Sequence, residues 1–284
     1  MNNVFNLKRF GQYFLYDLNN ARSNFGLSAL VIGLLPLIML VFNVIFGLVF
    51  GQEIVEAALP AKVVLIFFAF LFCILAAPVK LYGRLTERRS GSDWLMVPAS
   101  SFEKFLSMAL MLCIVVPVVV FGLFSICDLL LSWIVPAAYG QSISGKILSA
   151  IGQINDMSDV FASNGSFVFA PTTPGSQLAI ALMGWCGAIL PFGLGAVCFK
   201  KGKAAKTILC IIAVQIILSI ILVLLVKGGI NSGYDYGARI EQWFSDMTEK
   251  KAQFLVNLFI NLANLIVNGG LLVALFFRVK TIKQ

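Results

Sequence analysis

The stretch KLYGRLTERRSGSDWLMVPASSFEK, residues 80–104, is a polar and basic segment between two long apolar runs. Ser100 precedes Glu103 by three residues, which is the spacing of a capping box. In that motif the serine hydroxyl accepts from the backbone N–H of the glutamate, whose carboxylate accepts from the serine N–H. The segment is therefore predicted to be a connection that ends at a capped helix start. It could be a docking surface, or a solvated loop that only sets topology.

The composition indicates an all-α integral membrane protein. Of the 284 residues, 60% are hydrophobic and 12% are charged, and the mean hydropathy is +0.94. Soluble domains carry about 25% charged residues. The net charge of +8 is spread between the apolar runs, so we expect no nucleic-acid partner. The absence of His and of any clustered Cys predicts no metal site.

The apolar runs predict the number of membrane spans. A helix needs about 20 apolar residues to cross the hydrocarbon core. The chain is expected to be a single transmembrane domain, residues 1–284, with six helices. Their predicted ranges are 26–50, 61–79, 105–135, 177–199, 207–226 and 254–277.

A further helix is predicted before the first span. Leu7, Phe10, Phe14 and Leu18 fall on one helical face within residues 5–20, and charged residues occupy the others. This pattern is typical of an amphipathic helix lying in the membrane interface. The alternative is an unstructured tail.

The distribution of Lys and Arg predicts the orientation. Fifteen of the 21 basic residues lie in the N-terminus, the connections after the second and fourth spans, and the C-terminus. Basic residues accumulate on the cytoplasmic side, so both termini and residues 80–104 are expected to be cytoplasmic. The two long outer connections, 136–176 and 227–253, each contain apolar residues at helical spacing and suit interfacial or soluble helices.

Two polar features lie within the predicted spans. Asn257, Asn261, Asn264 and Asn268 form one stripe on the last helix, which predicts either a helix-packing seam or a face lining a pathway or dimer interface. Asp128 is the one acid well inside an apolar run. Its position near the outer end of the third span favours an interfacial residue, with a functional role as the alternative.

One nucleotide-binding pattern is incomplete. Residues 140–146, GQSISGK, have the glycine and lysine spacing of a phosphate-binding loop, but Ile147 stands where a magnesium-binding Ser or Thr is required. We therefore expect no ATPase activity, no enzyme activity and no directly bound cofactor.

Two motifs carry a resemblance to a known family. Residues 96–106, MVPASSFEKFL, resemble the pattern LPASxxEKFLxR that follows the second span in permease subunits of type-2 ABC exporters, especially in Bacteroidetes permease-like proteins. Residues 192–207 contain FGLG and FKKGKAAKT, similar to the stretch that closes the fourth span in those permeases. The chain departs from the pattern at Met108, where Arg is usual.

The resemblance implies a permease of the bacterial inner membrane that pairs with itself or a sister permease. It would act with a separate cytoplasmic ABC ATPase, which supplies ATP hydrolysis, and would export a lipid, peptide, antibiotic or glycan. The coupling element would be residues 81–94, with Arg84, Arg88 and Arg89 providing charge complementarity, Trp94 an apolar anchor, and Glu87 within the same element.

Two other functions fit the sequence. A non-transporting membrane protein, such as an assembly or sensor subunit, would use the Asn stripe as an interface and the basic loop for anionic lipid. An ion-coupled secondary transporter is expected to have paired intramembrane charges and broken helices. For that class the chain offers Asp128 alone.

Overall fold

The computed structural model describes residues 5–50, 59–86, 94, 96–146, 174–231 and 249–282. These residues form helices and connections, and no strand occurs among them. Five of the helices are long and apolar enough to cross a membrane, or six if α1 (Leu7–Gly33) and α2 (Leu35–Phe50) count as one bent span. The prediction of an all-helical membrane protein is confirmed at this level.

The N-terminal region differs from the expected helix-then-span arrangement. Helix α1 runs without interruption from the predicted interfacial segment into the first predicted span, and the break falls at Leu34, where α1 and α2 meet at 44°. Pro36 explains this position, because proline has no N–H to donate to the carbonyl four residues earlier and its ring clashes with that carbonyl. No such breaker stands between residues 20 and 26.

The third predicted span is also irregular. Helix α5 (Ser101–Leu110) continues through a π-helical turn, η2 (Met111–Val115), into α6 (Val116–Ile134). Pro117 lies just after the turn, where its missing N–H favours such a bulge. The Leu112 carbonyl accepts a hydrogen bond from the indole of Trp185 at 3.1 Å. The bulge thereby joins this span to α9 (Pro174–Cys198).

The core lies where α1, α3 (Leu59–Tyr82), α5–η2–α6, α9 and the end of α12 (Glu249–Thr281) meet. Trp185 is buried in this core, and the centre of its ring lies 5.2 and 5.6 Å from those of Phe70 and Phe121, in edge-to-face contact. Edge-to-face aromatic pairs at this distance add about 0.5–1.5 kcal/mol beyond area burial. The core therefore depends on contacts between spans that are far apart in sequence.

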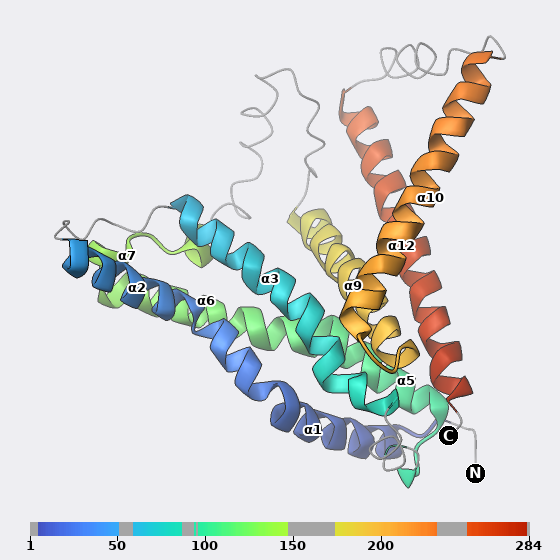
Figure 1. The fold of residues 1–284 in the computed structure, drawn as a ribbon, viewed down its shortest axis with the longest axis horizontal. Helices are drawn as coiled ribbons and strands as arrows, with labels where there is room; N and C mark the ends of the chain where they lie inside the picture. Colours follow the sequence, from blue (N-terminus) through green and yellow to red (C-terminus); the bar gives the residue numbers. More distant parts are fainter. Residues whose placement is uncertain are drawn as a thin grey trace.

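The helices form two arms that diverge from a shared end (Figure 1). One arm contains α2, α3, α6 and the short α7 (Pro136–Tyr139), and the other contains α9, α10 (Lys203–Asn231) and α12. Every residue of α10 from 208 to 221 is exposed. Apolar surface of this extent is typical of a helix that contacts lipid or another membrane subunit.

The shared end, which we call the basic end, comprises residues 5–9, 80–86, 94, 96–104, 198–206 and 276–282 (Figure 1). The start of α1 and the end of α12 both lie there. The ring of Phe102 lies 5.9 Å from that of Phe5, just before α1, and 6.2 Å from that of Phe276, near the end of α12. The connections that carry most of the basic residues thus meet at one end of the bundle.

Candidate functional site

The final residues of the predicted coupling element are tied to helix α1. Trp94 donates its indole N–H to the hydroxyl of Tyr13 at 2.9 Å. Lys104 donates to the Trp94 carbonyl at 2.7 Å, and its ammonium lies 4.5 Å from the centre of the Trp94 ring. Trp94 packs against the core of the chain itself. A partner that docked on Trp94 would therefore contact a side chain that is also bonded to α1.

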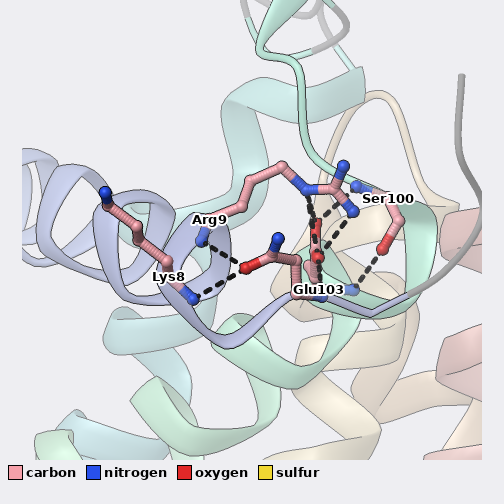
Figure 2. A network of polar contacts seen from close by, with 5 residues as sticks. Lys8, Arg9, Ser100 and Glu103 are labelled. Carbon is pink, nitrogen blue, oxygen red and sulfur yellow. Dashed lines mark hydrogen bonds and ion pairs between the residues drawn. The ribbon is translucent and has the colours of Figure 1, made fainter.

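Glu103 joins two helix starts (Figure 2). Its side chain is fully buried, and its carboxylate accepts from the backbone N–H of Ser100 at 2.8 Å and from that of Asn6 at 3.0 Å. The Ser100 hydroxyl accepts in return from the Glu103 N–H at 3.2 Å, which completes the capping box. This glutamate caps α5 and simultaneously binds the residue that begins α1.

Arg9 adds an ion pair to the same carboxylate (Figure 2). Its Nη2 lies 2.7 Å from Oε1 of Glu103, and its Nε lies 2.8 Å from Oε2. Asn6 caps α1 by accepting from the N–H groups of Lys8 and Arg9. A bidentate guanidinium–carboxylate contact fixes the relative orientation of the two side chains as well as their separation. The N-terminal helix is therefore held against the end of the 80–104 connection.

A second buried carboxylate lies further along α1 and α5 than the Glu103 network. Asp17 of α1 is 7% exposed and accepts from the hydroxyls of Tyr82 and Ser107, each at 2.7 Å. These donors come from α3 and α5, the two helices on either side of the 80–104 connection. A buried carboxylate requires such partners because its desolvation is costly. Sequence reasoning missed this cluster, since nothing local relates residue 17 to residues 82 and 107.

The start of the connection is fixed to a different pair of helices. Residues Gly83–Thr86 form a 3₁₀ turn, η1, in which the Thr86 hydroxyl donates to the Phe199 carbonyl at 3.2 Å. The ammonium of Lys203 donates to the Gly83 carbonyl. The connection is thus attached to the α9–α10 turn at one end and to α1 at the other. Arg84 is exposed in η1, whereas Glu87, Arg88 and Arg89 lie outside the described residues.

The predicted asparagine stripe lies partly against α9. Asn268 donates its amide to the Met183 carbonyl at 2.9 Å, as the packing-seam alternative predicts. Asn261 and Asn264 are half-buried, and the Oδ1 atom of Asn261 is enclosed with no hydrogen-bond partner among the described residues. The side chain of Asn257 lies outside the described residues. The stripe lies far from the Glu103 network in the sequence, and among the described residues it shares no hydrogen bond with that network.

Asp128 lies at the opposite end of its span from Glu103, within a separate polar cluster. It is fully buried and accepts from the Tyr139 hydroxyl at 2.6 Å and from the Ser144 backbone N–H at 2.8 Å. Lys62 is 2% exposed and donates to the carbonyls of Tyr139 and Gln141. The residues that imitate a phosphate-binding loop therefore fold over the end of α6, with Asp128 as their anchor.

Replacing Asp128 with Ala is expected to destabilise the chain by about 1–3 kcal/mol, because the Tyr139 hydroxyl and the Ser144 N–H lose a buried acceptor. Asp128→Asn keeps one acceptor oxygen and should be intermediate. Thermal unfolding of the purified protein in detergent measures both changes. An Asp128→Ala variant as stable as the wild type would contradict a structural role and would favour the ion-coupled alternative.

Among the described residues, no group of three or more His, Cys, Asp or Glu side chains is placed to hold a metal ion. Parts of the two outer connections, residues 147–173 and 232–248, lie outside the description, and the helices predicted there remain predictions. Comparison of the chain with protein-family models, with curated proteins and with solved structures gave no match.

Proposed function

We propose that this chain is the permease subunit of an ATP-driven exporter. In this proposal six spans cross the bacterial inner membrane, both termini are cytoplasmic, and a separate ABC ATPase docks on residues 81–94. A second copy or a sister permease packs against the exposed faces of α10 and α12. The substrate class stays open among lipids, peptides, antibiotics and glycans.

The observation that carries the proposal is the anchoring of the connection between α3 and α5. Its start is bonded to the α9–α10 turn through Thr86, and its end is bonded to α1 through Trp94 and Glu103. A displacement of such a loop is passed to several helices at once. A connection that only set topology has no need of these attachments, and the resemblance of residues 96–106 to exporter permeases supports the same reading.

Reversing the charge of Arg88 and Arg89 to Glu should reduce ATPase recovery roughly tenfold or more, since charge complementarity governs such docking. The measurement is co-purification of ATPase subunits with the tagged chain after mild detergent extraction. The matched control is Lys200→Glu with Lys201→Glu, which makes the same charge change at two exposed residues of the basic end outside the loop.

Two results would count against the proposal. If no ATPase is recovered with the wild-type chain, the exporter assignment fails, and the non-transporting alternative is favoured. If the wild type recovers an ATPase and the Arg88/Arg89 variant recovers as much as its control, the ATPase binds elsewhere. Membrane insertion of all variants is checked by their yield in the membrane fraction.

A further inference from the structure

Helix α10 packs against the rest of the chain mainly through its first turns. Thr207 is 4% exposed and lies against Gly195 of α9. From Ile208 to Ile221 every residue is exposed, on all sides of the helix. A span inside the bundle differs, because α6 buries a stripe that includes Val120 and Phe124 at a spacing of four residues. The middle of α10 therefore offers its whole circumference to lipid or to another membrane subunit.

Gln215 places a polar amide in the middle of this exposed surface. It lies nine residues beyond Lys206 and twelve before Lys227, and both lysines are exposed. At a rise of about 1.5 Å per residue the two lysines are about 31 Å apart, which matches a hydrocarbon core of about 30 Å. The lysines therefore suit the two membrane interfaces. Gln215 then lies near the bilayer centre, about 14 Å from the nearer interface, beyond the reach of its side chain.

The amide of Gln215 has no hydrogen-bond partner among the described residues, although its backbone carbonyl accepts from the Ser219 hydroxyl at 2.8 Å. Lipid tails offer neither a donor nor an acceptor, so an amide exposed to them is costly unless another protein group bonds to it. A primary amide has two N–H donors and a carbonyl acceptor. It is therefore complementary to a second copy of itself, whereas a carboxylate satisfies only its donors and an ammonium only its acceptor.

The neighbours of Gln215 define one face of the helix. Ile208, Ile211, Gln215 and Leu218 are all exposed and follow one another at spacings of three, four and three residues. This is the seam pattern of two packed helices, in which a single polar residue specifies register and partner number. A two-fold axis along the membrane normal brings the same helix of two copies together at the same depth. Each Gln215 would then lie opposite its counterpart.

We propose that α10 is a homodimer interface within the membrane, in which the Gln215 amides of two copies hydrogen-bond to each other beside the two-fold axis. The proposal rests on the pairing stated in the proposed function and narrows it to a second copy of this chain. A sister permease has no requirement for an amide at the same depth. The self-complementary chemistry of Gln215, in the centre of an exposed seam, is what favours the identical partner.

Self-association of the purified full-length chain in lipid bilayers tests the proposal. Energy transfer between fluorescently tagged copies, measured over a range of protein-to-lipid ratios, gives the dimer affinity. Gln215→Leu should weaken it roughly five- to thirtyfold, the effect of about 1–2 kcal/mol expected for an interhelical hydrogen bond in a membrane. The matched control is Gln215→Leu with Ile217→Gln, which keeps one amide but moves it to the opposite helix face. This control should associate as weakly as Gln215→Leu.

Disulfide cross-linking in membranes tests the position of the interface separately. In a Cys210→Ser background, which removes the exposed thiol of α10, Ile211→Cys should cross-link two copies on oxidation with copper phenanthroline. Ile217→Cys lies on the opposite face and should not. Because these side chains are exposed, the unfolding temperature of each variant should stay close to that of the wild type, which shows that the helix is intact.

Three results would overturn the proposal: a wild-type chain that stays monomeric at every ratio, Gln215→Leu associating as tightly as the wild type, or Ile217→Cys cross-linking in preference to Ile211→Cys. A chain that is monomeric alone but pairs with a different permease would assign the face to a sister subunit, which also contradicts it. No ATPase is present in these measurements. Their failure is therefore distinguishable from failure of the ATPase to co-purify.

Discussion

Replacing Glu103 with Ala is expected to release the start of α1 from α5 and to cause a large loss of stability. The substitution removes the acceptor of the backbone N–H groups of Asn6 and Ser100, whose hydrogen bonds are partly buried. Hydrogen bonds to a charged group contribute about 1.5–3 kcal/mol each, so these two alone account for about 3 kcal/mol or more. We expect the unfolding temperature to fall by roughly 5–10 °C. Thermal unfolding in detergent is the measurement.

Two further variants separate the functions of this side chain. Glu103→Gln retains the capping geometry, because glutamine also serves in a capping box, but it removes the charge that Arg9 contacts. Ser100→Ala removes only the cap of α5 and should cost about 0.5–2 kcal/mol. The expected order of stability loss is Glu103→Ala first, then the two milder changes. If Glu103→Ala costs no more than Ser100→Ala, the link to α1 contributes nothing.

Substituting Gly195 with Ala is the second change with a large expected effect. A Cβ atom at this position would lie 2.9 Å from the Cβ of Thr207 and would overlap its hydroxyl. Thr207 is a short β-branched residue in the first turns of α10, so relief requires movement of that helix. Overpacking of this kind costs about 1–3 kcal/mol. The unfolding temperature of Gly195→Ala should fall accordingly.

Gly184→Ala is the matched control for this substitution. Gly184 lies in the same helix, and a Cβ there would meet nothing within 4 Å. Alanine is the better helix former by up to about 1 kcal/mol, so this variant should be as stable as the wild type or slightly more stable. Equal stability of the two alanine variants would refute the close approach of α9 and α10.

Features that depend on residues close together in the chain could be predicted from the sequence. The spacing of Ser100 and Glu103 specified a cap, and the observed bonds have that pattern. The apolar runs specified long helices, since only satisfied backbone groups are stable in lipid. The bend at Leu34 could also have been predicted from Pro36, but the amphipathic pattern of residues 5–20 drew the expected break too early.

The sequence identified unusual polar residues within the helices but did not reveal their partners. Asp128 was recognised as unusual, yet its partners Tyr139 and Ser144 depend on how residues 135–146 fold back over α6. Lys62 lies at the edge of the predicted span 61–79, and only the structure shows that it is buried and binds two carbonyls of that same connection. The asparagine stripe identified the face of α12 that meets protein, and Asn268 makes that contact with α9.

By itself, the sequence determined the helical class, the apolar runs and the cap at Ser100, because each depends on residues within a few turns of one another. Only the tertiary structure decided that Glu103 also holds the start of α1, that Asp17 joins α3 to α5, and that Thr86 binds the α9–α10 turn. Those features arise from residues tens of positions apart. Their meeting is selected by the packing of whole helices, which no local spacing encodes.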